Sequence, residues 1–483
     1  MKATFLIPPC RDHRQSAERS AGCTRVVYPM PNIYELTAAA VVREVPGVET
    51  VSYRDFTAEK KPMEAFRSFL DTDRSDVYLI WTVNLSIESD LPAIADIDEA
   101  RPGVPVILLG PGPTYFTSRC LVSENVIIVR GEPEATLAEL IGRMTKGDMR
   151  PSDVMGTSVL REGKVINNPT RPLIEDLDAL PFAARDLVAD HEFHNPKLKT
   201  TPYATMFTSR NCPYRCIYCV PSSMTFAREI EHRRSGAPGR KPRIGFRSIG
   251  SVEKEVSMLH NQGVRAIGFM DDNFIWDEKR TEGICGIMRR YNIVWGCQAR
   301  ADAITEPIAR MLGESGCRYV DIGVESFNDD ILKYVHKGIT REDIFRAVNL
   351  LKKYGVPVKL NILIGCSPLE TTATVKQTLH EAKKLDVDQV MFNIVSPFPG
   401  TEYYDLCLKN GWIEGGEYRP TDVQRQSILN LPSLSSRQME RLLRSNNMKY
   451  FLSPRFIIKQ MRRYSSWNEF AHSLRALKTK LFG

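Results

Sequence analysis

The sequence lacks the features that would place the chain in a membrane or outside the cell. Its longest apolar stretches, such as VKLNILIGC (358–366), are far shorter than the ~20 residues that a membrane-spanning helix needs. The N-terminal MKATFLIPPCRDH has one lysine and a brief apolar run, which predicts a first β-strand rather than a signal peptide. The eleven cysteines then indicate a reducing compartment rather than a disulfide framework. We therefore expect a cytoplasmic protein.

The main part of the chain also has little excess charge of either sign. The net charge is +7, but residues 437–483 carry eleven Lys or Arg against two Glu, so the rest is nearly balanced. This distribution argues against nucleic acid as a partner and confines the basic character to a C-terminal tail. The tail predicts either a peripheral contact with anionic lipid or a basic helical cap packed on the protein. Its basic and apolar residues are Arg455, Lys459, Arg462, Arg463, Phe456, Ile457, Ile458 and Trp467.

Strand-like and helix-like segments alternate over residues 1–148, and this alternation predicts an α/β domain with a doubly wound, Rossmann-like parallel sheet. Ligands of such sheets bind beyond the carboxyl ends of the strands. There Gly110 and Gly112 would allow close approach of a backbone. The candidate ligand-binding residues at these ends are Pro9, Thr82, Gly110, Gly112, Pro113, Thr114 and Glu132.

Residues 149–200 are predicted to be a linker that contains a hairpin with Glu162-Gly163 at its turn. From 201 to 410, six strand candidates alternate with helical stretches, which predicts a partial (β/α)6 barrel. Polar side chains cluster after several of these strands, at the edge where β/α barrels form their sites. Residues 411–483 are predicted to be a helical C-terminal extension.

Three cysteines, Cys212, Cys216 and Cys219, lie within RNCPYRCIYC (210–219) after the first strand of the barrel. A structural zinc site needs four ligands, and no second CxxC pair is present. Alternatively, three thiolates can hold a 4Fe–4S cluster and leave its fourth iron open. The residues leave both a zinc-stabilised binding protein and an iron–sulfur enzyme open. The candidates for a fourth zinc ligand are His232, Cys285, Cys297, Cys317 and Cys366, of which the four cysteines are predicted to be buried small hydrophobic residues.

The segment CPYRCIYC (212–219) resembles the CxxxCxΦC signature of radical S-adenosylmethionine (SAM) enzymes, with Tyr218 as the aromatic residue Φ. The resemblance implies that the three cysteines bind a 4Fe–4S cluster. It also implies that the open iron chelates SAM, which a one-electron reduction cleaves to a radical that abstracts hydrogen. An external one-electron donor of the flavodoxin or ferredoxin type is implied as a partner.

The same resemblance implies roles for residues near the ends of the barrel strands. Tyr218 is expected near the adenine of SAM, and Asp271 and Asp272 near its methionine part. Arg300 would pair with the SAM carboxylate, and Glu325 would accept hydrogen bonds from the ribose or the amine. The alternative interpretations are helix capping by the two aspartates and a structural ion pair between Arg300 and Glu325.

Residues 1–410 further resemble a subfamily with an N-terminal cobalamin-binding domain, through GPGPT (110–114), RGEPEAT (130–136), FMDDNF (269–274) and SPFPGTEYY (396–404). Its members include methyltransferases, anaerobic cyclases and enzymes of hopanoid synthesis. The resemblance implies bound cobalamin, methyl transfer to an unactivated carbon and a small-molecule or lipid-like substrate. Cyclisation or oxidation without methyl transfer is the alternative. The chain departs from the pattern in having no DxHxxG motif among its eight histidines.

Overall fold

The structure is a computed structural model that describes residues 1–457 except 11–15, 26–28, 60–62, 237–240 and 455. It divides into two compact units. The first comprises residues 1–215, 219–299 and 306–320, and the second comprises 216–218, 300–305 and 321–483. The first unit therefore joins the predicted N-terminal domain to the first strands of the predicted barrel. Most of the segment 455–483, where the lipid-contact residues were predicted, lies outside the described residues.

The first sheet has the strand order β2-β1-β3-β4-β5-β6-β7. The strands from β2 to β5 pair in parallel, and β6 and β7 add to the β5 edge in antiparallel pairing. The order of the parallel strands is that of a doubly wound sheet whose switch point lies between β1 and β3. The prediction of a doubly wound N-terminal sheet is confirmed. Its strands are β1 (Lys2–Ile7), β2 (Thr50–Asp55), β3 (Val77–Trp81), β4 (Val106–Leu109), β5 (Val126–Val129), β6 (Thr157–Arg161) and β7 (Lys164–Asn167).

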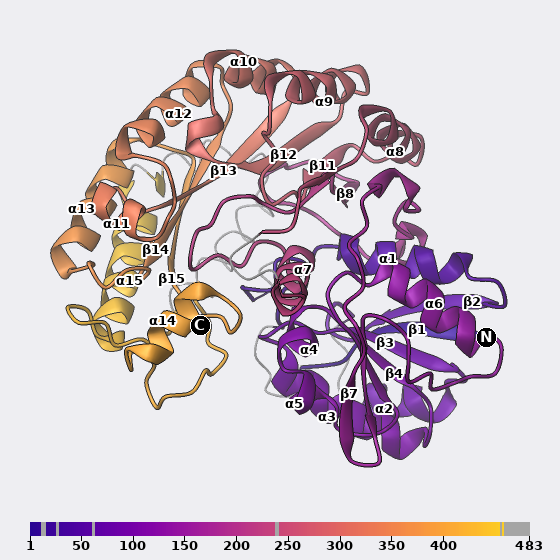
Figure 1. The fold of residues 1–483 in the computed structure, drawn as a ribbon. Coiled ribbons are helices and arrows are strands. Elements are labelled where there is room, and N and C mark those ends of the chain that lie inside the picture. Colours follow the sequence, from indigo (N-terminus) through magenta and orange to yellow (C-terminus); the bar gives the residue numbers. More distant parts are fainter. Residues whose placement is uncertain (11–15, 26–28, 60–62, 237–240, 455, 458–483) are drawn as a thin grey trace. The chain divides into compact units, whose positions relative to one another are not determined.

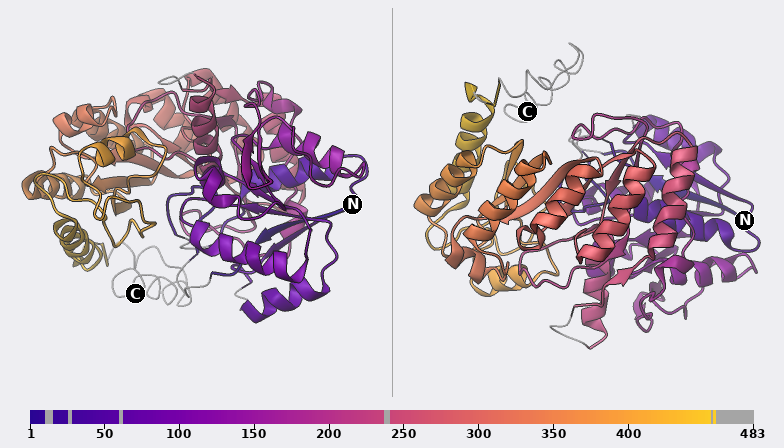
Figure 2. Two further views of the ribbon diagram at one scale, coloured as in Figure 1. Left: turned by 60° about the horizontal axis from the view of Figure 1, so that its bottom comes forward. Right: turned by 90° about the horizontal axis from the view of Figure 1, so that it is seen from above.

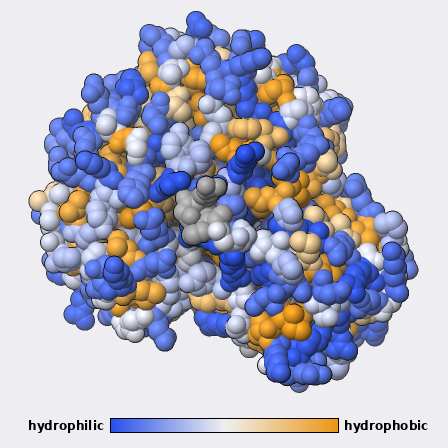
Figure 3. All heavy atoms as spheres, viewed as in Figure 1, coloured by the Kyte–Doolittle hydropathy of each residue, from blue (hydrophilic) through white to orange (hydrophobic). Residues whose placement is uncertain are grey.

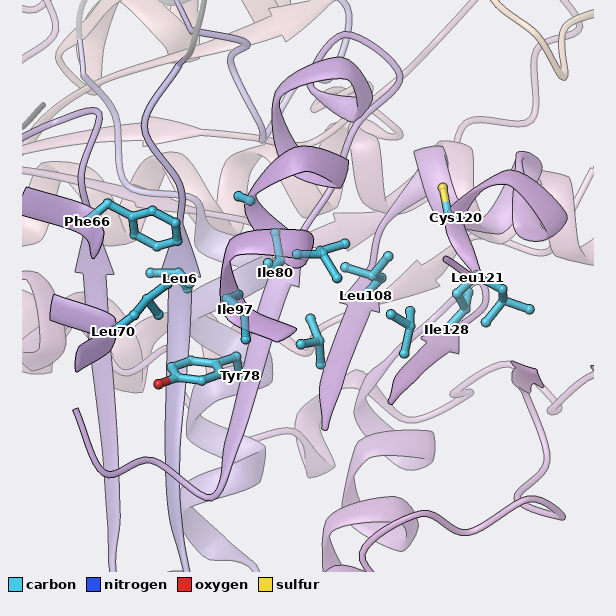
Figure 4. Close-up of a cluster of buried hydrophobic side chains, with 14 of the residues drawn as sticks. Leu6, Phe66, Leu70, Tyr78, Ile80, Ile97, Leu108, Cys120, Leu121 and Ile128 are labelled. Atoms are coloured by element: carbon cyan, nitrogen blue, oxygen red, sulfur yellow. The ribbon is translucent and has the colours of Figure 1, made fainter. Parts of the chain in front are cut away.

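Helices cover both faces of this sheet (Figure 1). The core beneath one face is an apolar cluster of side chains from the strands and from α2, α3 and α5, drawn in Figure 4. Cys120 lies in this cluster and is fully buried, as a small hydrophobic residue would be. On the other face α1 packs against α6. The helices are α1 (Ile33–Glu44), α2 (Met63–Thr72), α3 (Ile87–Ala100), α5 (Thr117–Cys120) and α6 (Glu134–Met144).

The hairpin predicted in the linker is present, but it extends the first sheet. Glu162 and Gly163 form its turn with positive φ angles of 49° and 73°, a combination that a tight two-residue hairpin turn requires. Strand β6 pairs with β5, so the hairpin lengthens a sheet whose first five strands are parallel. Pattern alone predicted the turn, whereas the pairing partner depends on the tertiary structure.

The second sheet has the order β15-β14-β13-β12-β11-β8 and confirms the six strands of the predicted partial barrel. The first unit contains β8, β11, β12 and the start of β13, and the second contains the end of β13 with β14 and β15. Parallel pairing joins β8 to β11, β11 to β12, and β14 to β15. The strands are β8 (Tyr203–Met206), β11 (Ala266–Phe269), β12 (Val294–Ala299), β13 (Cys317–Glu325), β14 (Val358–Ile364) and β15 (Gln389–Ile394).

Within each unit, helices lie along the outer side of these strands (Figures 1 and 2). In the second unit α12 packs on β14, and α15 packs on β15 and α13. Within the predicted helical extension 411–483, α15 is helical and begins at a capping box formed by Ser435 and Gln438, whereas residues 411–435 contain no helix. The outer helices are α8 (Ile249–Asn261), α9 (Glu278–Arg290), α10 (Glu306–Glu314), α12 (Arg341–Lys353), α13 (Thr372–Lys384) and α15 (Ser436–Phe451).

None of the helices in the described part of the chain is long and apolar enough to cross a membrane. On the face drawn in Figure 3, hydrophobic residues occur in small groups among hydrophilic ones. Such scattered apolar residues are ordinary for a folded protein surface.

Candidate functional site

The cysteine segment is a loop between β9 (Ser209–Arg210) and α7 (Ser223–Arg234). β9 pairs in antiparallel fashion with the short strand β10 (Gly245–Phe246), which fixes the start of the loop. Asn211 then takes a positive φ of 81°, a conformation that asparagine tolerates better than most residues. Cys212, Cys216 and Cys219 follow, and all three are partly exposed, whereas the predicted buried cysteines 285, 297, 317 and 366 are indeed buried. None of the eleven cysteines forms a disulfide.

Asp271, which follows β11, fastens the chain just before the loop. Its carboxylate accepts hydrogen bonds from Thr208 N (3.0 and 3.1 Å), Thr208 Oγ1 (2.8 Å) and Ser209 Oγ (2.5 Å). Burial raises the pKa of this carboxyl, and the hydrogen bonds from Ser209 and Thr208 only partly oppose that rise. Asp271 therefore has structural partners, and its predicted contact with SAM stays a prediction.

Asp272 fastens the chain just after the loop. It accepts hydrogen bonds from Ser222 N at 2.6 Å and from Thr225 Oγ1 at 2.5 Å, at the first turn of α7. A carboxylate at this position also favours the N-terminus of the helix electrostatically. Together the two neighbouring aspartates hold both ends of the cysteine loop, which is close to the capping role that the sequence left as the alternative.

The side chain of Arg210, two positions before Cys212, reaches residues at the carboxyl edge of the first sheet. Its guanidinium donates to Glu132 Oε1 and to Glu134 Oε1, each at 2.6 Å, and the side chains of all three residues are at most 4% exposed. The Glu132 carboxylate, predicted to bind cobalamin, also accepts a hydrogen bond from Ile174 N at 2.8 Å. Neither Arg210 nor Glu134 was expected from the sequence, because an arginine beside a cysteine motif carries no signal of its distant partner.

Aromatic side chains of the N-terminal elements reach the same region. Tyr34, in the first turn of α1, donates from its hydroxyl to Met270 O at 2.9 Å. Its ring lies 6.3 Å from Trp81 and 5.9 Å from Phe207, measured between centroids. Trp81, at the end of β3, donates from Nε1 to Ser223 Oγ at 3.1 Å. These contacts place the carboxyl edge of the first sheet against both β11 and the start of α7.

The predicted cobalamin residues lie at that edge. Thr82 is buried, and its Oγ1 has no hydrogen-bond partner among the described residues; the same holds for the amide oxygen and nitrogen of Asn84. Buried polar atoms without partners are rare in a folded protein and mark places where a polar ligand or water belongs. Pro9, Pro113 and Thr114 are also buried and follow the ends of β1 and β4.

The two glycines at this edge allow two segments of the chain's own backbone to lie close together. A Cβ atom on Gly110 would lie 2.7 Å from Thr82 O, and one on Gly112 would lie 3.1 Å from it. Gly110 also has a φ of 95°, so two independent constraints require glycine there. This close approach is between segments of the chain itself, at the start of the short helix α4 (Pro111–Tyr115), and the predicted approach to a ligand stays a prediction.

The second unit holds Arg300, Glu325 and Lys337 close together. Glu325 ends β13 with a φ of 61° and accepts a hydrogen bond from Lys337 Nζ at 2.7 Å. Arg300 instead pairs with Asp302, at 2.9 and 3.0 Å, so the alternative of an Arg300–Glu325 ion pair is not what forms. Burial lowers the pKa of Lys337, but Glu325 first and then Cys216 outweigh that effect and raise it. Lys337 is therefore a cation beside Cys216 that no motif in the sequence indicated.

Tyr218, the aromatic residue of the cysteine motif, is 8% exposed and belongs to the same unit. Backbone atoms hold its neighbour Ile217, whose N donates to Val335 O at 3.2 Å and whose O accepts from Tyr403 N at 2.9 Å. The contact of Tyr218 with the adenine of SAM stays a prediction, as do the SAM contacts of Arg300 and Glu325.

Within the described residues, no three His, Cys, Asp or Glu side chains are grouped so that they would hold a metal ion. The assignment of a cluster to the three cysteines therefore depends on their motif and on the family. Residues 206–382 match the family model of the Radical SAM superfamily. The chain is also 30% identical over 469 residues to an uncharacterized methyltransferase of Pyrococcus horikoshii, with 95% of each chain covered. The chain belongs to the radical SAM superfamily.

Two further similarities extend over most of the chain. An anaerobic magnesium-protoporphyrin IX monomethyl ester cyclase of Rubrivivax gelatinosus is 24% identical over 425 residues, which are 85% of this chain and 72% of that protein. The solved structure of OxsB, a cobalamin-dependent SAM radical enzyme with aqua-cobalamin and SAM bound, is also similar. The match covers 100% of this chain and 71% of the OxsB chain, with a TM-score of 0.71 and 16% identity. That likeness shows the shared fold.

Membership of this superfamily confirms that the protein is an enzyme, and it implies a 4Fe–4S cluster and SAM as cofactors. The partly exposed cysteine loop fits the cluster, because thiolates are its usual ligands and the loop is fastened at both ends. The superfamily assignment also favours the enzyme over the zinc-stabilised binding protein.

Proposed function

We propose that this radical SAM enzyme is a cobalamin-dependent methyltransferase that acts on an unactivated carbon of a small-molecule or lipid-like substrate. The observation that carries the proposal is that one compact unit contains the first sheet together with Cys212, Cys219 and the start of α7. Trp81 and Tyr34 bring the carboxyl edge of that sheet against Ser223 and Met270. A cofactor at the sheet's switch point would therefore lie beside the loop that holds the cluster.

The cobalamin assignment is supported by the unpartnered polar atoms of Thr82 and Asn84, which offer hydrogen bonds at the end of β3. It is also supported by the sheet order, since doubly wound sheets bind ligands where the strand order reverses. OxsB, which has the same fold, is named as cobalamin-dependent. When bound, the cluster and SAM supply a hydrogen-abstracting radical, and cobalamin supplies a carrier for the methyl group.

The chain's own residues prepare this site in three ways. Asp271 and Asp272 fix the ends of the cysteine loop, because their carboxyl oxygens accept hydrogen bonds from Thr208 and from Ser222. Tyr34 and Trp81 fill the space beside the loop with buried aromatic surface, which excludes water from that side. Lys337 keeps a positive charge near Cys216, where it can offset the negative charge of a thiolate ligand.

Anaerobic purification followed by reconstitution with iron, sulfide and hydroxocobalamin tests the proposal. We expect a brown protein that binds one corrinoid and, with SAM and a strong reductant, forms 5′-deoxyadenosine. We also expect about one equivalent of S-adenosylhomocysteine per bound corrinoid, because loss of the methyl group converts SAM to that product. A colourless protein with stoichiometric zinc would refute the enzyme, and absence of corrinoid binding at micromolar concentration would refute the cobalamin proposal.

A second candidate is cyclisation or oxidation without methyl transfer, which the similarity to the Rubrivivax gelatinosus cyclase favours. This candidate predicts corrinoid binding and 5′-deoxyadenosine without S-adenosylhomocysteine. Both candidates need one-electron reduction, and we infer a flavodoxin- or ferredoxin-type donor. Comparison of metabolites between strains with and without the protein would identify the substrate: a mass difference of one CH₂ supports the methyltransferase.

A further inference from the structure

The fork of Arg210 between Glu132 and Glu134 is the most deeply buried ion-pair network beside the cysteine loop. The exposed fractions of the three side chains are 1%, 4% and 1%. Arg210 belongs to β9, while both glutamates lie between β5 and the first turn of α6 in the N-terminal sheet. The fork thus joins two segments about 78 residues apart in sequence within the first unit.

The surroundings of the fork hold its charges in place. Phe207 lies under the Arg210 guanidinium, 4.8 Å from its central carbon to the ring centroid. Arg228 of α7 places its Nε 3.5 Å from Glu132 Oε1, and its Nη1 is buried without a hydrogen-bond partner among the described residues. Two arginines and two glutamates therefore balance each other, because a buried charge is tolerated only when it is paired.

Other contacts already attach the N-terminal sheet to α7, so the fork is not needed merely to join them. Arg130 and Glu231 form a second buried ion pair at the far end of α7, with side chains 3% and 5% exposed. Trp81 contacts Ser223 at the start of α7. The fork differs from these because it acts on the backbone that leads directly into Cys212.

Neither Asp271 nor Asp272 forms a hydrogen bond with residues 210–212, the part of the backbone that contains Arg210. Asp271 holds residues 208 and 209, and Asp272 holds the start of α7. Between Ser209 and Cys212 the chain turns through the positive φ of Asn211, whose Nδ2 donates to Arg243 O at 2.8 Å. One residue earlier, the Arg210 guanidinium donates to one oxygen of each of two carboxylates, and these charge-assisted bonds hold its planar group in one orientation.

We propose that Glu132 and Glu134 are positioning residues for the iron–sulfur site, which act through Arg210 to orient the first cysteine of the loop. The inference rests on the proposed function, since it takes the three cysteines as the cluster ligands. Arg210 and Ile174 N each donate to one oxygen of the Glu132 carboxylate, and its predicted contact with cobalamin stays a prediction. The N-terminal sheet then serves the cluster as well as the corrinoid.

The test compares four reconstituted proteins: wild type, a Glu132→Gln/Glu134→Gln variant, the same variant with Arg210→Met, and a Glu231→Gln control. Removing only the carboxylates leaves Arg210 buried and unpaired, so that variant also loses stability. The triple variant removes Arg210 together with both of its partners and leaves only Arg228 unpaired, so we expect it to lose less stability than the double variant. It separates loss of positioning from loss of folding.

We expect both fork variants to bind a cluster, as judged by iron content, but to give an altered electron paramagnetic resonance spectrum of the reduced cluster with and without SAM. Formation of 5′-deoxyadenosine should fall on the order of 10- to 100-fold, the range in which small misplacements act. The control should keep the wild-type spectrum and rate. A wild-type spectrum and rate in the folded triple variant would overturn the proposal.

The proposed function fails separately from this inference. If the wild-type protein binds a cluster and cleaves SAM but the triple variant matches it, only the positioning role is lost. If the wild-type protein itself binds no cluster, both are overturned. If the wild-type protein cleaves SAM but binds no corrinoid, the cobalamin proposal falls and the positioning role is judged by the same spectra.

Discussion

Replacing Lys337 with methionine should strongly destabilise the second unit. Lys337 Nζ lies 2.7 Å from Glu325 Oε1, and the two side chains are only 9% and 7% exposed, so solvent screens the pair little. Breaking such a buried pair costs about 3–5 kcal/mol, because the remaining charge keeps its desolvation penalty without compensation. At about 2–4 °C per kcal/mol, the melting temperature should fall by roughly 6–20 °C.

The double variant Glu325→Gln/Lys337→Met should recover most of that loss, because it leaves no buried charge unpaired. Differential scanning calorimetry of the apo-protein under anaerobic conditions measures both variants. Arg341→Met is a matched control in the same unit: its ion pair with Glu381 is partly exposed, with 45% of the arginine side chain accessible, and should be worth less than about 1 kcal/mol. The reasoning would be refuted if Lys337→Met had the same melting temperature as the Arg341→Met control. It would also be refuted if the melting temperature of the double variant were no higher than that of Lys337→Met.

Three further predictions follow from single sites. Burial, which outweighs Arg19 and Tyr53, raises the pKa of Glu35 from 4.5 to about 8, so its contribution to stability is full below pH 4.5 and is lost as the pH rises through about 8. Glu35→Gln should therefore flatten the pH dependence of the melting temperature between those values, and an unchanged slope would contradict this. Gly110→Ala should lower the melting temperature, since its Cβ would meet Thr82 O at 2.7 Å; a wild-type melting curve would show that the turn adapts. Alanine at any cysteine of the loop should abolish iron binding and SAM cleavage, whereas Cys120→Ala should leave the iron content, measured by inductively coupled plasma mass spectrometry, unchanged. The cysteines of the loop are Cys212, Cys216 and Cys219.

Local pattern predicted the elements well where one segment contains its own signal. The six strands from β8 to β15 were evident because short apolar runs alternate with helical periodicity. The hairpin turn at Glu162-Gly163 was evident because few residues accept two positive φ angles in succession. Its addition to β5 was not, because hydrogen bonds between strands depend on which edge is free after folding.

The candidate site was predicted only in part, for a similar reason. Cys212, Cys216 and Cys219 carry their meaning in their spacing, so the motif identified them at once. No spacing along the chain identifies Arg210, Glu134 or Lys337, since each acquires its role from a partner that the fold brings close to it. Asp271 and Asp272 were noticed for their position after a strand, but whether they face a ligand or the chain itself depended on the geometry of the loop.

The sequence by itself determined the chemistry of this protein: three thiols at a characteristic spacing, placed after the first strand of a β/α repeat, indicate a radical SAM enzyme. Spacing along the chain is enough because one short loop carries all three ligands. Only the tertiary structure decided that the N-terminal sheet and the first barrel strands form one unit. It also decided that Glu132 and Glu134 hold Arg210. Charged residues that are far apart in sequence meet only through folding, and once buried they must be paired, because desolvation makes an unpaired buried charge unfavourable.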